Sequence, residues 1–192
     1  MLKIHEILHN MAVESTSVPN APSFEQAIAL TQSLLDQIEQ DTIPEQEVEQ
    51  TIATLVGSEN GARGFFVTYL SDERPLVEHM FPVVARALSV APEVISPLMV
   101  KNLAMSTAMG IAHRRNQSES LAQGSDLVRS RAAHIVQALS LPQLQAEAEK
   151  LAASIDTGTG AYQSFLQRWG YDVEQQQAIR EALLQSGLLD SH

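Results

Sequence analysis

The sequence has no cysteine among its 192 residues. Disulfide frameworks, thiolate nucleophiles and cysteine-based zinc sites are therefore excluded. The same absence fits a reducing compartment, so we expect a cytoplasmic protein. Aromatic residues make up only 5% of the chain. No stretch alternates apolar and polar residues as a half-buried β-strand does, which leaves helices as the expected secondary structure.

Positive charge is also scarce, with 12 lysine and arginine residues against 23 acidic ones and a formal net charge of -11. Nucleic-acid backbones and anionic membrane surfaces repel such a chain, so we expect it to bind neither. Residues 81–140 are the exception, because their six bases and three acids give a net charge of +3. These bases could bind an acidic protein partner, or they could compensate acidic helices of the same chain. The candidate partner-binding residues are His113, Arg114, Arg115, Arg129 and Arg131.

Helical periodicity runs through nearly the whole sequence. Ser23 with Gln26, and Thr42 with Glu45, have the spacing of a capping box, which marks the start of a helix. Pro82 falls inside a helical pattern and should kink or split that helix. We expect a compact all-α bundle of about eight or nine helices.

Residues 97–113, PLMVKNLAMSTAMGIAH, are apolar on almost every side of a helix. The segment is too short for a comfortable membrane span, and Lys101 interrupts it. A helix that is apolar all round is normally the buried centre of a globular protein. We therefore expect this segment at the centre of the bundle.

The chain shows an internal similarity. Residues 42–88 align with residues 140–184 after a two-residue gap in a glycine loop, and Pro44 then meets Pro142. We hypothesise a tandem duplication, with two similar four-helix units flanking the apolar helix. The alternative is that helix-rich sequences align through periodicity alone. The expected parts of this single domain are an N-terminal helix (1–16), a proline linker (17–22), a first helical unit (23–90), the central helix with its basic end (91–118) and a second helical unit (119–187).

The pattern H-E-x-x-H, typical of zinc hydrolases, occurs in the stretch HEILH, residues 5–9. The extended form of that motif would need Gly and His where the chain has Ala12 and Ser15. On a helical wheel both histidines lie beside an apolar stripe, on its solvent flank. We expect at most adventitious metal binding by His5 and His9, and no cofactor, which makes a zinc hydrolase the least favoured function.

Residues 155–161, IDTGTGA, contain the D-T-G triplet of aspartic proteases. That chemistry needs two carboxylates that share a proton, and only one such triplet is present. We interpret Gly158 and Gly160 as the stop signal of a helix instead.

Two functions of different classes remain. The first is a non-enzymatic interaction or regulatory protein that binds another protein, with a homodimer possible. The second is a carrier or sensor of a small apolar ligand, bound between the two helical halves. Core packing is the alternative for the residues that would line such a pocket. These are Met99, Met105, Met109, Phe66, Tyr69, Tyr162, Phe165 and Trp169.

Overall fold

The computed structural model describes residues 19, 21–139 and 141–190. Within these residues the chain forms ten α-helices and no strand, which confirms the all-α bundle. The predicted helix at 1–16 and half of the predicted linker, residues 17, 18 and 20, lie outside the described residues. In chain order the helices are α2 (Phe24–Glu39), α3 (Glu45–Val56), α4 (Glu59–Ser71), α5 (Leu76–His79), α6 (Phe81–Leu88), α7 (Pro92–Arg115), α8 (Glu119–Leu139), α9 (Pro142–Thr157), α10 (Gln163–Trp169) and α11 (Val173–Gln185).

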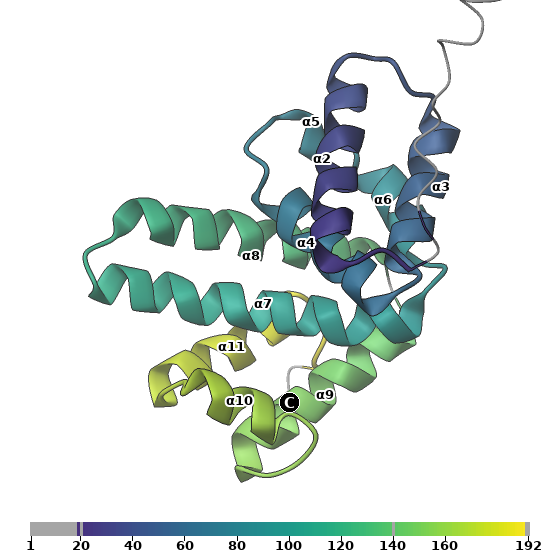
Figure 1. The fold of residues 1–192 in the computed structure, drawn as a ribbon. Coiled ribbons are helices and arrows are strands. Elements are labelled where there is room, and N and C mark those ends of the chain that lie inside the picture. The colour runs from purple at the N-terminus through teal and green to yellow at the C-terminus, as the bar shows by residue number, and fades with distance from the viewer. Residues whose placement is uncertain (1–18, 20, 140, 191–192) are drawn as a thin grey trace, which may run out of the picture.

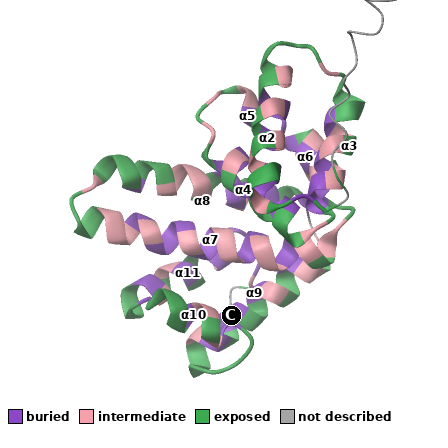
Figure 2. Ribbon diagram, viewed as in Figure 1, coloured by how far each residue is buried: buried purple, intermediate pink, exposed green. Residues whose placement is uncertain are grey.

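The predicted apolar segment forms the central helix, α7. Helices α2 to α6 gather at one end of α7, α8 runs back beside it, and α9 to α11 lie on its other side (Figure 1). Buried residues run along its length (Figure 2), and Met99, Val100 and Ala108 are completely buried. The helix begins at Pro92, five residues before the expected start, so that Pro97 lies inside it.

By length and composition, α7 is the one described helix that could cross a membrane. In this fold 56% of its most apolar stretch is buried inside the protein. Such burial is what the core helix of a globular protein shows.

The two predicted capping boxes have different outcomes. The first is confirmed: the Gln26 backbone N–H donates to Ser23 Oγ over 3.2 Å, and the Ser23 N–H donates to the Gln26 side chain over 2.9 Å. The second is wrong, because the Thr42 hydroxyl donates to the Gln37 carbonyl at the end of α2. Pro44 takes the N-cap position of α3 instead. A proline restricts the residue before it to extended conformations, so Ile43 cannot be the first helical residue and α3 begins only after Pro44.

The predicted split at Pro82 is confirmed. The periodic segment forms two helices, α5 and α6, and Pro82 lies in the first turn of α6. A proline is tolerated there because the first-turn N–H groups have no intrahelical partner.

Helices α2 and α4 cross closely because Gly64 has no side chain. A Cβ atom at Gly64 would lie 2.5 Å from the Ala27 Cβ and 2.8 Å from the Phe24 carbonyl oxygen. The close crossing brings Arg63, the neighbour of Gly64, over the ring of Phe24.

The two predicted units share a helix order but differ in packing. α2 packs against α4, whereas α8 packs mainly along α7 and also touches α4 and α6. α3 packs against α6, whereas α9 packs mainly against α7. The tandem duplication therefore stays a prediction.

Candidate functional site

The predicted basic cluster lies where α7 turns into α8. Arg114 pairs with Asp126 and Glu119, and Arg115 pairs with Asp172 and Glu174 of α11. These are charge-compensating contacts within the chain.

Two further residues of the predicted cluster, Arg129 and His113, lie close by. Arg129 pairs with Asp126 over 3.3 Å, and His113 is half-buried in the last turn of α7. The intramolecular alternative for these residues is thus present in the structure, while their binding of a partner stays a prediction.

Arg131 requires a correction, because it is not a surface residue. It is only 4% exposed. Its guanidinium donates to the Leu70 carbonyl over 3.1 Å, to the Asp72 carbonyl, and to Glu78 over 2.9 Å. Arg131 therefore holds α8 against the end of α4 and the start of α5, and it has no surface with which to meet a partner.

Half of the predicted pocket residues lie elsewhere. Met99, Phe66 and Tyr69 are between 0% and 1% exposed and form part of the hydrophobic core. The Tyr69 hydroxyl donates to the Val77 carbonyl over 2.9 Å inside that core. Met109 is half-buried and does not line the pocket described next. The core alternative is correct for the first three, and it also holds for Tyr162, which is 4% exposed and belongs to the same core.

The other four predicted residues, Met105, Tyr162, Phe165 and Trp169, line one groove. Its volume is about 710 Å³, and it is open to solvent. We call it the inter-half groove, because its walls come from α2 and α4 on one side, from α7, and from α9, α10 and the loop between them on the other. Its lining residues are Phe24, Glu59, Arg63, Val67, Pro97, Leu98, Lys101, Asn102, Met105, Glu147, Lys150, Ala161, Tyr162, Ser164, Phe165, Arg168 and Trp169.

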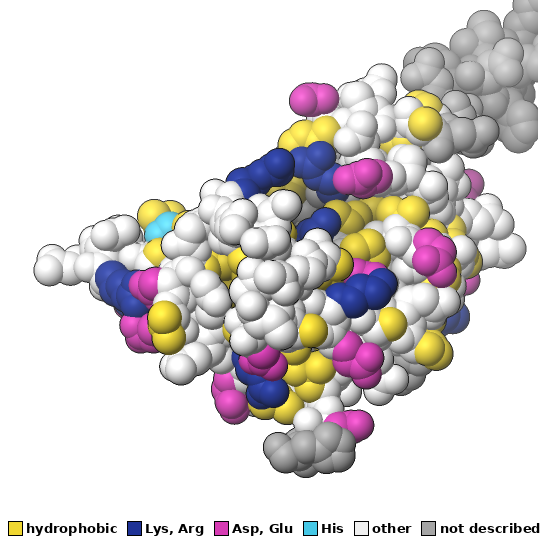
Figure 3. Space-filling model, turned by 90° about the horizontal axis from the view of Figure 1, so that it is seen from below, with side chains coloured by type: hydrophobic (Ala, Val, Ile, Leu, Met, Phe, Trp, Pro, Cys, Tyr) yellow, Lys and Arg dark blue, Asp and Glu magenta, His cyan; other side chains and the backbone are white. Residues whose placement is uncertain are grey.

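Positive charge gathers in this groove although the chain as a whole is acidic. Among the described lysine and arginine residues, Arg63, Lys101 and Arg168 are those that no carboxylate approaches within 4.0 Å, and all three line the groove. The face of the molecule seen from below carries lysine and arginine side chains at several places, and the largest group, near its upper edge, lies beside hydrophobic side chains (Figure 3). Every other described lysine or arginine has a carboxylate partner: Arg74, Arg86, Arg114, Arg115, Arg129, Arg131, Lys150 and Arg180.

Two of the three unpaired cations lie over aromatic rings. The guanidinium of Arg63 is 5.3 Å from the centre of the Phe24 ring, and the ammonium of Lys101 is 5.9 Å from the centre of the Tyr162 ring. A cation over a ring at an exposed site gains only about 0.5–1 kcal/mol. These charges therefore remain available to an anionic group.

One of the two acidic side chains that line the groove, Glu147, already has hydrogen-bond donors. Glu147 accepts hydrogen bonds from the Tyr162 hydroxyl and from Lys150, each over 2.6 Å. Burial disfavours its charged form, but these two donors outweigh that effect and lower the pKa of Glu147. Burial raises the pKa of Tyr162, and the hydrogen bond to Glu147 raises it further, so the hydroxyl stays protonated as a donor. Among the described residues that line the groove, four are lysine or arginine and two are glutamate.

The loop between α9 and α10 places Tyr162 in the groove. Gly158 ends α9 in the left-handed conformation with φ of 68°, which confirms the predicted helix stop. Gly160 follows with φ of 111°, and the Tyr162 N–H then donates to Ser154 Oγ over 3.1 Å. The chain thereby folds back onto α9, and the tyrosine side chain reaches Glu147 on the same helix.

Aromatic side chains continue from Tyr162 along α10. Phe165 meets Tyr162 edge-on with 6.1 Å between ring centres, and it meets Tyr171 at 6.0 Å. Trp169 stacks on Tyr171 yet remains 46% exposed. Val67, on the α4 side of the groove, is 50% exposed. The groove thus has apolar surface in contact with solvent on both sides.

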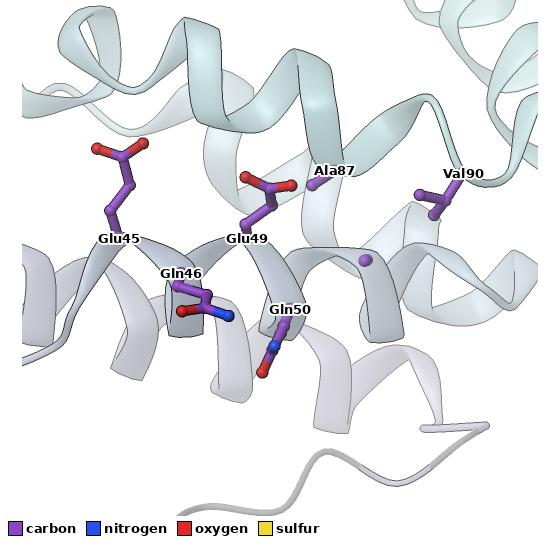
Figure 4. A pocket seen from close by; sticks show the side chains of 7 residues that line it. Glu45, Gln46, Glu49, Gln50, Ala87 and Val90 are labelled. Atoms are coloured by element: carbon purple, nitrogen blue, oxygen red, sulfur yellow. The ribbon is translucent and has the colours of Figure 1, made fainter.

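A second hollow of about 460 Å³ lies between α3 and α6 (Figure 4). The side chains of Glu45 and Glu49 point toward α6, and Arg86 of that helix binds both of them, over 2.6 Å and 2.8 Å. Because these charges are already paired, this hollow is a weaker candidate for a binding site than the inter-half groove.

Metal chemistry finds no support within the described part of the chain, where no three His, Asp or Glu side chains gather around a common point. The HEILH stretch, with His5 and His9, lies outside the described residues. The zinc-hydrolase interpretation therefore stays untested.

The three unpaired cations were missed in the sequence. Each stands alone in its segment, and two of them, Arg63 and Arg168, belong to acidic parts of the chain. The one sequence signal that could have indicated them is helical spacing, which puts Arg63 and Val67 on one face of α4. That signal does not say which faces of different helices meet.

No curated protein and no solved structure matches the chain. Residues 23–186, which span every described helix, match the family described as "Uncharacterised conserved protein UCP020893". The chain therefore belongs to that family.

Proposed function

We propose that the protein is a non-enzymatic interaction protein that binds another protein through the inter-half groove. The observation that carries this proposal is that Arg63, Lys101 and Arg168 converge on one groove; they are the lysine and arginine residues of the described chain without a carboxylate partner. The other lysine and arginine side chains of the described chain pair with carboxylates, most of them on another helix or loop and two, Arg129 and Lys150, on their own helix. Cations that serve no such purpose and border solvent-exposed aromatic surface are typical of a recognition site.

Binding is better supported than catalysis. No histidine is found among the described residues that line the groove, and its tyrosine–carboxylate pair is already engaged, since Glu147 also holds Lys150. A general base needs a free acceptor within reach of a substrate proton. Glu147 has two donors bound to it and a lowered pKa, which makes it a poor base.

A protein partner is better supported than a small molecule. Pockets for small ligands enclose most of the ligand surface, whereas this groove is open. Trp169 and Val67 present exposed apolar surface beside it, and tryptophan and arginine are frequent energetic centres of protein interfaces. A carrier of a small ligand is the second candidate, because about 710 Å³ falls within the usual range for ligand pockets. The absence of cysteine and the net charge of -11 support a partner in the cytoplasm rather than nucleic acid or a membrane surface.

Site-specific photo-crosslinking in cells that express the full chain tests this proposal. A benzophenone amino acid replaces Ser164, which is exposed in the groove, or Gln46, which is exposed in the α3–α6 hollow and serves as the matched control. We expect one discrete protein adduct from position 164 and none from position 46, and we expect Arg168→Glu to abolish the adduct. No adduct from position 164, or equal adducts from both positions, would contradict the proposal.

A further inference from the structure

We infer that the segment bound in the inter-half groove is an amphipathic helix whose apolar anchors are flanked by acidic side chains. This inference rests on the proposed function and names the chemistry of the partner. It depends on the pattern of charge and apolar surface on each helix that borders the groove.

Two of the helices that line the groove, α4 and α7, each place a cation one helical turn from an apolar side chain. On α4, Arg63 and Val67 are four residues apart, and on α7, Lys101 and Met105 have the same spacing. Residues four apart lie on the same face of a helix. The walls therefore repeat one arrangement, a positive group beside an apolar one.

The third wall, α10, repeats it in shorter form. Arg168 follows Phe165 by three residues, which also places both on one face, and Trp169 lies next to them. An occupant that satisfies all three walls must carry negative and apolar groups in alternation on one face. An amphipathic helix supplies this arrangement with acids three or four residues from its apolar anchors.

Charge complementarity predicts that the bound segment carries negative charge. A basic or neutral segment would leave Arg63, Lys101 and Arg168 without counter-charges at the interface, and burying unpaired charge is costly. The net charge of -11 repels an acidic partner at long range. At physiological ionic strength charges farther apart than about 8 Å are largely screened, so the groove cations dominate once the partner is in contact.

The experiment uses fluorescence anisotropy with the full chain and synthetic peptides of about 18 residues, or five helical turns. One peptide carries leucine and phenylalanine anchors flanked by glutamate. A second has lysine in place of every glutamate, and a third keeps the glutamates but has serine in place of every anchor. Decanoate serves as a small amphiphilic competitor.

We expect the acidic amphipathic peptide to bind at least about tenfold more tightly than either of the other two. The double variant Lys101→Gln, Arg168→Gln should weaken it at least about tenfold, whereas Arg180→Gln, which removes a paired surface cation, should not. Equal binding of the lysine peptide would overturn the inference about charge. Equal binding of the anchor-free peptide would reduce the groove to an anion site and overturn the inference about the helix. Tighter binding of decanoate than of any peptide would favour the small-ligand carrier.

The two proposals fail in distinguishable ways. If position 164 crosslinks a protein but the acidic peptide does not bind, the groove binds a partner of other chemistry and only this inference is wrong. If neither experiment shows binding that depends on Lys101 and Arg168, the proposed function is wrong as well.

Discussion

The ammonium nitrogen of Lys101 lies 5.9 Å from the centre of the Tyr162 ring, where α7 meets the loop before α10. The hydroxyl of the same tyrosine donates to Glu147 over 2.6 Å. One ring thus connects a cation of the central helix with an acid of α9. The apolar face of Tyr162 and its hydroxyl have separate roles, which single substitutions can separate.

Replacing Tyr162 by Phe should raise the pKa of Glu147. The change removes one of the two hydrogen bonds that favour the carboxylate and keeps the ring under Lys101. A carbon-13 NMR titration of the glutamate carboxyls measures the effect. Tyr171→Phe is the matched control, because the buried Tyr171 hydroxyl has no hydrogen-bond partner in the described structure, and it should leave Glu147 unchanged. An unchanged pKa in Tyr162→Phe would show that Lys150 alone holds the carboxylate.

The lowered pKa of Glu147 predicts that the stability of the fold depends on pH. Folding lowers the pKa of Glu147, so its carboxylate stabilises the fold above its unfolded pKa of about 4.5. That contribution is lost as the pH falls through the lower folded value. The free energy of unfolding of the wild type should therefore exceed that of Glu147→Gln at pH 6, and the gap should narrow as the pH falls below about 4.5. Urea unfolding at several pH values measures it, and a constant gap would contradict the assignment.

Replacing Gly64 by Ala should destabilise the fold by about 1–3 kcal/mol, because the new methyl group would overlap the backbone and side chains of α2. Gly124→Ala is the matched control. Gly124 lies in α8 with nothing within 4 Å of an added Cβ, so alanine should stabilise that helix by about 0.5–1 kcal/mol. Urea unfolding measures both, and effects of the same sign would contradict the close crossing of α2 and α4.

Replacing Arg131 by Ala should lower the free energy of unfolding by about 2–3 kcal/mol, since it leaves the carbonyls of Leu70 and Asp72 without their charged donor. Arg129→Ala, two residues away on the exposed side of α8, loses only a surface ion pair and should change stability by less than about 0.5 kcal/mol. Equal effects in chemical unfolding would mean that Arg131 does not hold α8 to α4.

Features set by neighbouring residues could be predicted from the sequence. The Ser23–Gln26 cap, the split at Pro82 and the stop at Gly158 each depend on a few adjacent residues, and all three are confirmed. The central position of α7 could also be predicted, because a helix without a polar face can only be buried. The capping box predicted at Thr42 was wrong because Pro44 shifts the start of α3.

The candidate site could be predicted only in part. Tyr69 and Tyr162 occupy comparable positions in aromatic segments and both are buried, at 0% and 4% exposed, yet only Tyr162 also lines the groove. Residue type and periodicity are the same for both, and the difference arises from which helices pack together. Likewise Arg131 and Arg129 look alike in the sequence, but only the tertiary fold buries the former. Pairing of charges across distant helices cannot be read from local spacing.

Replacing Arg168 by Gln separates a recognition role from a structural one. Arg168 has no carboxylate within 4.0 Å in the described structure, so its removal breaks no ion pair, and the free energy of unfolding should change by less than about 0.5 kcal/mol. Arg180→Gln, which breaks an exposed pair with Asp156 at 3.3 Å, should have an equally small effect on stability. The two variants lose the same charge and should differ only in binding of the acidic peptide. A loss of more than about 1 kcal/mol in Arg168→Gln would show that the fold itself uses this cation, and the groove would then lose one of the three charges on which its assignment depends.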